Sequence, residues 1–379
     1  MHPIPYGRQS IDDEDVRAVV ETLRSDWLTT GPKVNDFESA ACDYCGSRYA
    51  IAVNSGTSAL DIAIQSLGLS KGTEVITTPF TFAATSNALL YNGLVPVYAD
   101  ITKDTRNIDP DDVIKKVTYK TGAVLFVDFA GHPCDISELR ELCEERDLFL
   151  IEDACHALGA EYYGKRIGSL TDMTIFSFHP VKLITTGEGG MVTTNNPDLA
   201  QNLQLYRSHG IDKTDHHISR TGAPWAYDMK VLGRNYRITD IQASLGLSQI
   251  KKIDAFVRKR TQIAEMYNEL LENVPLIELP ITKANVKHAW HIYTLLISDK
   301  RRDSVYAYLR SQNIGVNLHY IPTYHLSYYQ TNHPQNPEKF PITEEIFSQI
   351  LTIPLYPDLQ DDEVQFIADT IKKAINISS

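Results

Sequence analysis

A single lysine, Lys182, lies in a run of mostly apolar and small residues between Thr174 and Gly190. Burial disfavours the charged ammonium, so a lysine in this setting can be held neutral and nucleophilic, ready to condense with an aldehyde. The alternative is a lysine that extends its amine from a half-buried strand end to the surface, which is the commoner fate of any one lysine. This stretch alone does not decide between the two.

Two carboxylates and a histidine follow an apolar run in Phe149-Leu-Ile-Glu-Asp-Ala-Cys-His. Carboxylates at the mouth of a buried strand cost free energy unless they meet a cation. Asp153 could therefore pair with a protonated pyridine nitrogen, which would strengthen such a ring as an electron sink. It could equally be an ordinary helix N-cap.

Two further turns carry groups suited to a cofactor. Asn54-Ser-Gly-Thr-Ser-Ala-Leu leads into a helix expected to begin near Thr57, where free amides and hydroxyls suit a phosphate, although many strand-to-helix turns merely cap. Phe82, in Thr77-Thr-Pro-Phe-Thr-Phe-Ala-Ala-Thr, could cover a flat ring or belong to the core. The glycine patterns that bind dinucleotides and nucleoside triphosphates do not occur in the sequence, so those functions lose their main support.

The lysine, the acid, the aromatic ring and the hydroxyl-rich turn share one position, just after a strand. Each follows a different expected strand of one sheet. Sites in parallel sheets lie beyond the carboxyl ends of the strands, so these groups should converge. Their convergence predicts a pyridoxal phosphate site.

Short β-rich runs alternate with helical segments from residue 49 onward. This alternation predicts an α/β fold with a mainly parallel sheet covered by helices on both faces. The expected strands are Tyr49–Val53, Glu74–Thr77, Val95–Ala99, Ala123–Asp128, Phe149–Asp153, Thr174–Phe178 and Met191–Thr194.

The pattern changes after residue 207. The interval from Ser208 to Gly233 is rich in Gly, His and Asp and is expected to be a mobile or partner-contacting loop. Thr239 then caps a long helix over about 239–272. We expect this helix to link a large domain, residues 1–250 including the N-terminal segment, to a small α/β domain, residues 251–379. The elements expected in the small domain are Trp290–Ile297 and Val316–Tyr320 as strands and Asp303–Gln312 and Asp361–Ile375 as helices.

Composition narrows the class of protein. The chain has 379 residues, 43% hydrophobic and 22% charged, which is typical of a globular protein with a substantial core. Its 36 basic and 48 acidic residues give a net charge of −12, which argues against nucleic acid or an anionic membrane as the main partner. No apolar run approaches a membrane span and the amino terminus lacks a signal layout, so we expect a soluble, cytoplasmic protein.

Five cysteines show no disulfide-scaffold rhythm. Cys42 and Cys45 form a Cys-x-x-Cys pair, but no second pair completes a tetrahedral set of ligands. We interpret them as reduced thiols on a helix and expect no metal.

Taken together, these motifs resemble the DegT/StrS family of nucleotide-sugar aminotransferases over nearly the whole chain. The resemblance implies the aspartate aminotransferase fold of type I, pyridoxal 5'-phosphate as cofactor, and a homodimer with active sites at the subunit interface. The motifs that carry it are Asn54-Ser-Gly-Thr-Ser-Ala-Leu, Thr78-Pro-Phe-Thr-Phe, Glu152-Asp-Ala-Cys-His-Ala-Leu-Gly, Phe176-Ser-Phe-His-Pro-Val-Lys with Glu188-Gly-Gly, Asn235-Tyr-Arg and His319-Tyr-Ile-Pro.

The resemblance also implies roles for single residues. Lys182 would bind the cofactor covalently and later move a proton between substrate and cofactor. Asp153 would hold the pyridine nitrogen, with the third catalytic candidate, His156, beside it. The other residues implied to bind the cofactor are Phe82 on the ring and Thr57, Ser58, Ser177 and the partner subunit's Asn235 at the phosphate. The residues implied to contact the sugar nucleotide are Tyr6, Arg237, His319 and Tyr320.

The implied reaction is a ping-pong transfer from L-glutamate, which leaves as 2-oxoglutarate, to a 4-keto sugar carried on a nucleotide. Within the family, His156, Ser208-His-Gly and His319-Tyr-Ile-Pro-Thr-Tyr are most similar to enzymes that aminate a UDP-4-keto-6-deoxy-N-acetylhexosamine on the way to pseudaminic acid. Alternatives are a UDP-4-keto-pentose or a GDP-perosamine precursor as substrate, a dehydratase of the same fold, in which histidine replaces the lysine, and a non-catalytic cofactor-binding regulator.

Overall fold

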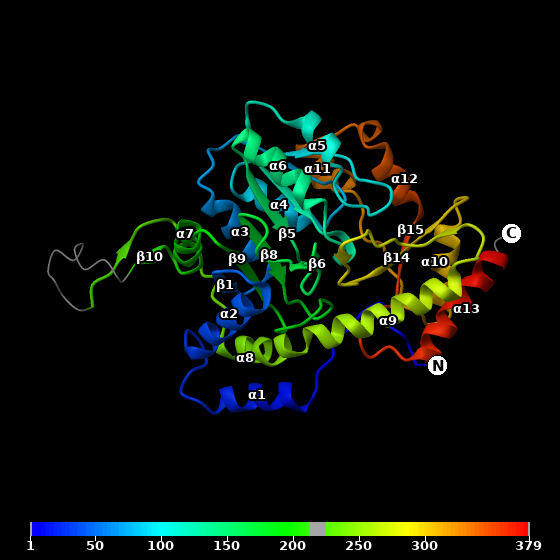
Figure 1. Ribbon diagram of the computed structural model, residues 1–379, viewed down its shortest axis with the longest axis horizontal. Coiled ribbons are helices and arrows are strands. Elements are labelled where there is room, and N and C mark those ends of the chain that lie inside the picture. The colour runs from blue at the N-terminus through cyan, green and yellow to red at the C-terminus, as the bar shows by residue number, and fades with distance from the viewer. Residues whose placement is uncertain (1, 213–224, 378–379) are drawn as a thin grey trace.

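The computed structural model describes residues 2–212 and 225–377 and places a large α/β body around one sheet (Figure 1). The sheet has seven strands in the order β1-β9-β8-β5-β4-β2-β3. Each strand matches an expected one within two residues. Their bounds are β1 Tyr49–Val53, β2 Glu74–Thr77, β3 Val95–Tyr98, β4 Thr121–Val127, β5 Phe149–Asp153, β8 Met173–Ser177 and β9 Gly190–Thr194.

Strand direction decides where the site can form. Strands β3, β2, β4, β5 and β8 pair in parallel, whereas β9 runs antiparallel to both β8 and β1. β1 therefore points the same way as β8. The carboxyl ends of β1, β2, β5 and β8, which precede the four candidate groups, lie along one edge of the sheet.

Helices cover both faces of this sheet, as the alternation of elements predicted. Neighbouring residues of a strand point to opposite faces, so Ile151 packs with one layer of helices and Leu150 with the other. The first layer consists of α3 Gly56–Ser66, α4 Ala83–Tyr91 and α7 Pro197–Arg207. The second layer includes α2 Pro32–Cys45, α5 Pro110–Lys116, α6 Ile136–Arg146 and α8 Asp240–Gln249.

The helical connection to the C-terminal part begins where the sequence indicated. Thr239 caps α8, and its side chain and that of Gln242 form a reciprocal capping box. The expected single helix at about 239–272 is in fact α8 and α9 Ile253–Leu271, joined by the 3-10 turn Ile250–Lys252. The helix α1 Asp13–Leu23 packs along α8.

A separate apolar core forms in the C-terminal part. It unites α9 with α10 Arg302–Ser311, α13 Asp361–Ile377 and an antiparallel sheet of β12 Ile277–Glu278, β14 Tyr293–Ile297 and β15 Ile350–Ile353. Ile4, from the other end of the sequence, is part of the same core. The domain boundary at residue 250 stays a prediction.

The expected strand at Val316–Tyr320 is wrong. Only Asn317 pairs with β15, through an isolated bridge to Thr352 in which the two backbones exchange hydrogen bonds of 3.1 and 2.8 Å. Beyond it the chain leaves the sheet, because residues 318–320 turn to line a cavity.

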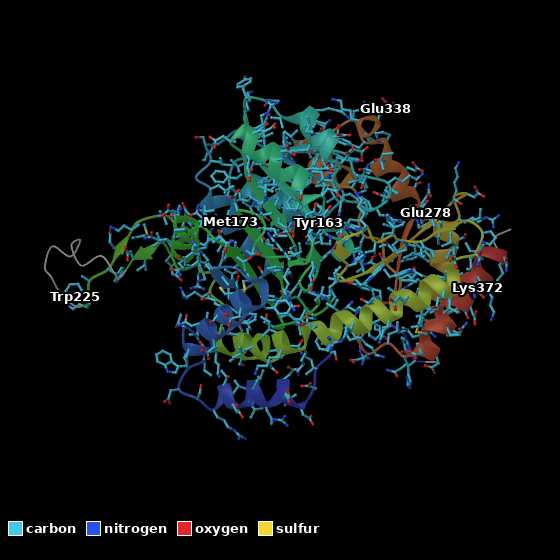
Figure 2. All side chains as sticks on the ribbon, in the orientation of Figure 1. Tyr163, Met173, Trp225, Glu278, Glu338 and Lys372 are labelled. Carbon is cyan, nitrogen blue, oxygen red and sulfur yellow. The ribbon has the colours of Figure 1, made fainter. Side chains whose placement is uncertain are left out.

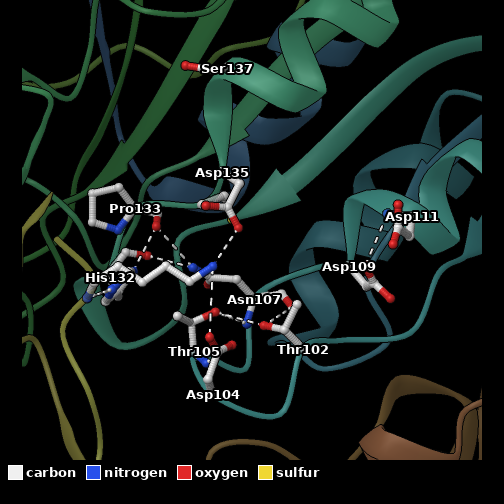
Figure 3. Close-up of polar contacts among 12 residues, drawn as sticks. Thr102, Asp104, Thr105, Asn107, Asp109, Asp111, His132, Pro133, Asp135 and Ser137 are labelled. Atoms are coloured by element: carbon white, nitrogen blue, oxygen red, sulfur yellow. Dashed lines mark hydrogen bonds and ion pairs between the residues drawn. The ribbon is translucent and has the colours of Figure 1, made fainter. Parts of the chain in front are cut away.

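Polar side chains fix the segment that follows β4. The Asn107 amide donates to the carbonyls of His132 and Pro133, at 3.0 and 3.2 Å (Figure 3). Its oxygen accepts from the Phe129 N–H at 2.8 Å. Lys283 from the C-terminal part binds the Asp135 carboxylate at 2.8 Å. These bonds fix the turn that follows the carboxyl end of β4.

The remaining elements are short. A narrow arm beyond α7 contains β10 Ile211–Asp212 and β11 Asp228–Met229 and projects from the body (Figure 1). Figure 2 labels Trp225, which is exposed on the arm, and Met173, which is buried in the sheet. The expected loop at 208–233 lies partly outside the described residues. The other short elements are β6 Glu161–Tyr162, β7 Lys165–Arg166, β13 Val286–Lys287, α11 Ser327–Asn332, α12 Pro341–Gln349 and the 3-10 turns Phe129–Gly131, Thr323–His325 and Pro337–Lys339.

Two smaller expectations can be compared with the structure. Cys42 and Cys45 both lie on α2 with free thiols, as expected. None of the helices in the described ranges combines the length and the apolar character that crossing a bilayer requires.

Candidate active site

A cavity of about 520 Å³ opens at the carboxyl edge of the large sheet. It collects most of the residues that the sequence singled out, although they come from positions 6 to 320 of the chain. The predicted residues that line it are Tyr6, Thr57, Phe82, Asp153, His156, Ser177, Lys182, His319 and Tyr320.

Three predicted residues lie elsewhere in this single chain. Ser58 is buried in α3, and its hydroxyl donates to the Asn54 amide oxygen at 2.7 Å, so it faces its own turn. Asn235 is exposed outside the cavity, and Arg237 pairs its backbone with β1. The predicted role of Asn235 concerns the partner subunit, so the position of Asn235 in one chain does not test it.

Lys182 is presented by a tight, hydrogen-bonded loop between β8 and β9. Its N–H donates to the His179 carbonyl at 2.8 Å, closing a turn, while the Phe178 carbonyl accepts from the Thr186 N–H and the Thr185 hydroxyl, each at 3.0 Å. The Thr186 hydroxyl donates to another carbonyl of the loop at 2.7 Å, so both threonine hydroxyls are bonded within the loop.

The environment of Lys182 favours the neutral amine. Burial lowers the pKa of Lys182 below its ordinary value, and the nearby Cys155 and Asp153 only partly oppose this shift. A lowered pKa raises the fraction of amine that can act as nucleophile or base.

Asp153 ends β5 with its carboxylate held in place. Thr85, on α4, donates its hydroxyl to Oδ2 at 2.8 Å and also bonds to the Thr81 hydroxyl at 2.9 Å. The N–H of Cys155 donates to Oδ1 at 3.3 Å. Asp153 is therefore oriented within the wall of the cavity, and it does not serve as the N-cap of a helix, which was its alternative role.

The start of α3 forms a cradle for an anion. Ser55 caps the helix and accepts from the Ser58 N–H, while the amides of Gly56 and Thr57 in the first turn have no partner within the helix. A Cβ on Gly56 would lie 2.9 Å from the Ser177 Cβ, and one on Gly190 would lie 2.4 Å from the Ser55 carbonyl oxygen. Only glycines let β8, β9 and this turn approach so closely.

Histidines and tyrosines form the inner wall. Tyr320 Oη lies 2.9 Å from His156 Nε2, and the ring of His291 lies 4.3 Å from that of His156, centre to centre. Burial pushes the pKa of both imidazoles well below the ordinary value, so both are neutral. Nδ1 of His156 is buried without a protein partner.

The outer wall is a second hydrogen-bonded group. His319 Nδ1 lies 2.8 Å from the Thr352 hydroxyl, and its Nε2 lies 3.4 Å from the Asn317 amide nitrogen. An amide nitrogen only donates, so Nε2 accepts and the proton sits on Nδ1. Burial lowers the pKa of His319 to about 3. The Tyr6 ring packs beside His319, 5.5 Å between ring centres.

Sequence reasoning missed several residues of the cavity. Thr85 was within reach, because it ends the Thr-Pro-Phe-Thr-Phe-Ala-Ala-Thr motif three residues after Phe82. His291 and Asn317 carried no local signal, since they come from the C-terminal part and meet the sheet only through tertiary packing.

The residues fit pyridoxal phosphate. The cradle at α3 offers amides and the Thr57 and Ser177 hydroxyls to a phosphate, and Asp153 offers a carboxylate to a ring nitrogen. Phe82 leaves 63% of its side chain uncovered in the cavity wall, which a flat ring would cover. A lysine with a lowered pKa completes the set.

Comparison with known proteins decides the family. A model of the DegT/DnrJ/EryC1/StrS aminotransferase family matches residues 9–372. The chain belongs to this family. A UDP-4-amino-4,6-dideoxy-N-acetyl-beta-L-altrosamine transaminase of Campylobacter jejuni is 38% identical to this aminotransferase over 378 residues, 97% of this chain and 96% of that protein.

Two solved structures are similar to this aminotransferase. PseC of Helicobacter pylori, an aminotransferase involved in the biosynthesis of pseudoaminic acid, has a TM-score of 0.93 at 33% identity and covers 99% of this chain and 100% of its own. The PLP form of the sugar aminotransferase Spr1654 of Streptococcus pneumoniae has a TM-score of 0.93 at 30% identity, with 100% of both chains covered. The chain is a pyridoxal-phosphate-dependent sugar aminotransferase with the fold of type I. This assignment replaces the two alternative functions, a dehydratase of the same fold and a non-catalytic cofactor-binding regulator.

Proposed function

We propose that this aminotransferase moves an amino group from L-glutamate to the C4 keto group of a UDP-4-keto-6-deoxy-N-acetylhexosamine. The product is a UDP-4-amino sugar for pseudaminic acid-type surface glycans. The substrate assignment is supported by the similarity, over almost the whole of both chains, to the Campylobacter transaminase named above. Lys182 and Asp153 in the cavity support the reaction type.

Lys182 is the acid and base of the proposed reaction. Bound pyridoxal phosphate supplies an aldehyde that takes up the amino group and a ring that withdraws electrons. The Nζ of Lys182, buried and with a lowered pKa, accepts and returns the proton at the carbon that gains or loses nitrogen. Asp153, oriented by the Thr85 hydroxyl, would hold the ring nitrogen of the bound cofactor.

The outer wall orients the sugar. Asn317 donates to Nε2 of the neutral His319, and its amide lines the cavity beside the Tyr6 phenol. These groups suit the hydroxyls and the N-acetyl group of a sugar. The nucleotide lies far from the reacting carbon, so its binding energy serves to fix the sugar against Lys182.

The proposal includes a homodimer whose partner subunit supplies Asn235 to the phosphate site. The projecting arm supports association, because three of its large apolar side chains are mostly exposed. They are Trp225 at 75%, Tyr227 at 64% and Met229 at 59%. Exposed apolar patches of this kind mark association surfaces. The cytoplasmic location stays a prediction.

A substrate panel tests the proposal. Purified enzyme receives L-glutamate and, in turn, UDP-, dTDP- and GDP-linked 4-keto sugars, and 2-oxoglutarate is followed. We expect the highest kcat/KM with the UDP-linked 6-deoxy-N-acetylhexosamine. Amination of a GDP sugar alone, or of a UDP-pentose in preference, would show that the proposed substrate is wrong while leaving the aminotransferase activity intact.

A further inference from the structure

Two buried carboxyls lie directly behind the cofactor site, and the reaction does not use either. Asp128 follows β4, and Glu152 is the residue before Asp153 on β5; neither side chain is accessible to solvent. Because side chains alternate along a strand, Glu152 points away from the cavity that Asp153 lines. Two ionised carboxylates side by side in an apolar layer would cost several kcal/mol.

Each carboxyl has one oxygen with a protein donor and one without. Asp128 Oδ1 accepts from the Cys134 N–H at 2.9 Å, and Glu152 Oε2 accepts from the Thr174 hydroxyl at 2.8 Å. Asp128 Oδ2 and Glu152 Oε1 are buried and accept no hydrogen bond from a donor group. Phe126 of β4 lies opposite Glu152 of β5, so Asp128, two residues after Phe126, points to the same face of the sheet as Glu152. The two carboxyls are side-chain hydrogen-bond partners, and such a bond requires a proton on one of them.

We propose that Asp128 and Glu152 share one proton and form a clamp that positions Asp153 against the cofactor. The clamp joins three neighbouring strands: Asp128 follows β4, Glu152 lies on β5, and Thr174 lies opposite Glu152 on β8. The backbone closes it as well, since the Asp128 N–H donates to the Asp153 carbonyl at 3.2 Å. Asp128 and Glu152 are thus positioning residues, and they touch neither cofactor nor substrate.

The electrostatic setting supports the shared proton. Burial raises the pKa of Asp128 and of Glu152, and the charge of Glu152 raises that of Asp128 further. The other ionisable groups that face the pair are the thiol of Cys134, the thiol of Cys45 on α2, and Arg140 on α6, whose charge acts on Glu152. The pair titrates as a unit, with one proton and one negative charge.

The sign of the pH effect follows from the raised pKa. An unfolded chain releases both protons above pH 4 to 4.5, roughly the ordinary carboxyl pKa, whereas the folded chain keeps one. Folding therefore takes up a proton. The contribution of the pair to stability falls as the pH rises from the ordinary carboxyl pKa to the raised pKa of the pair, and it is constant above that pKa.

Amide substitutions test the clamp. In Asp128→Asn an amide N–H replaces the shared proton, and Glu152→Gln does the same from the other side.

The full chain, with and without pyridoxal phosphate, is unfolded with urea between pH 5 and 8. Each variant takes up one proton fewer than the wild type when it folds. We therefore expect the folding equilibrium constant of the variant, divided by that of the wild type, to rise about tenfold per pH unit up to the pKa of the pair. Asp100→Asn, which replaces a buried carboxylate whose oxygens accept from Ile342 and Thr343, is the matched control and should show no such trend.

Cofactor retention separates positioning from packing alone. Asp128→Ala breaks the links to Cys134 and Glu152, and we expect it to raise the dissociation constant for pyridoxal phosphate about tenfold, whereas Asp128→Asn restores it to within about twofold. Equal retention in the two variants would overturn the positioning role.

Infrared spectroscopy of the wild-type enzyme requires no variant to fold. We expect the carbonyl stretch of a protonated carboxyl group at pH 7. Its absence, or identical pH dependence of unfolding in wild type, Asp128→Asn and Glu152→Gln, would show that no proton is shared.

Discussion

The cavity has two walls that differ in origin. The cofactor wall carries Thr57, Asp153, Ser177 and Lys182, each at or just beyond the carboxyl end of a strand in one sheet. The substrate wall unites the outer wall with His291 and Tyr320 of the inner wall. It consists of Tyr6 from the N-terminal segment and of His291 and residues 317–320 from the C-terminal part. The first wall is built by local order along a sheet, and the second exists only because distant segments pack together. We therefore expect changes in the first wall to affect chemistry and cofactor, and changes in the second to affect sugar binding.

The largest effect should come from Lys182→Ala. This change removes both the covalent link to the cofactor and the proton carrier, so we expect kcat to fall by about 10⁴-fold or more. Borohydride should no longer fix pyridoxal phosphate to the protein, which mass spectrometry would measure. Lys251→Ala, an exposed lysine outside the cavity, is the control and should retain both properties. Substantial turnover in Lys182→Ala would contradict the role of the cofactor wall.

Asp153→Asn should rank second. The change keeps the shape of the side chain but removes the charge that holds the ring nitrogen protonated, and losing one member of a buried ion pair costs about 3–5 kcal/mol. We expect kcat to fall by about 10²- to 10³-fold, with KM for the sugar nearly unchanged. Asp61→Asn, an equally buried carboxylate bonded to Tyr236 and Arg234 away from the cavity, should keep near-normal kcat. If Asp153→Asn mainly raised KM for the sugar and left kcat unchanged, the two walls would not have separate roles.

A change in the substrate wall should have the opposite signature. Asn317→Ala removes the amide beside His319 Nε2 and leaves the cofactor wall untouched. We expect KM for the sugar nucleotide to rise about tenfold, the effect of roughly one lost hydrogen bond to a polar ligand, with unchanged affinity for pyridoxal phosphate. Asn332→Ala on α11 is the control. Reduced cofactor affinity in Asn317→Ala would show that the walls are coupled.

The smallest effect concerns pH and His319. The pKa of His319 is lowered to about 3 in the folded protein. Below about pH 6.5 the unfolded chain therefore binds a proton at this histidine that the folded protein does not bind. The stability that His319 contributes is present above that pH and is lost as pH falls toward 3. We expect His319→Gln to flatten the acid side of the stability curve by up to one proton, about 1.4 kcal/mol per pH unit, in urea unfolding between pH 4 and 7. An unchanged slope would mean that the imidazole titrates normally.

The contrast between the walls also explains what could be predicted. Seven strands, the cap at Thr239 and the convergence of Lys182, Asp153, Phe82 and the α3 turn were predicted correctly, because each is encoded over a few neighbouring residues. The strand at 316–320 was predicted wrongly. Val316, Leu318 and Tyr320 alternate with polar residues, which favours a strand, but the chain pairs with β15 at Asn317 alone and residues 318–320 line the cavity instead.

The sequence by itself determined the chemistry at the carboxyl edge of the sheet. A lysine, an acid and a glycine-containing turn, each following an apolar run, require only that parallel strands end together. Tertiary structure alone decided the rest. It turned Ser58 toward Asn54, placed Thr85 on Asp153, brought His291 beside His156, and paired Asp128 with Glu152. Contacts between residues far apart in sequence depend on how layers pack, and no local pattern of residue types specifies them.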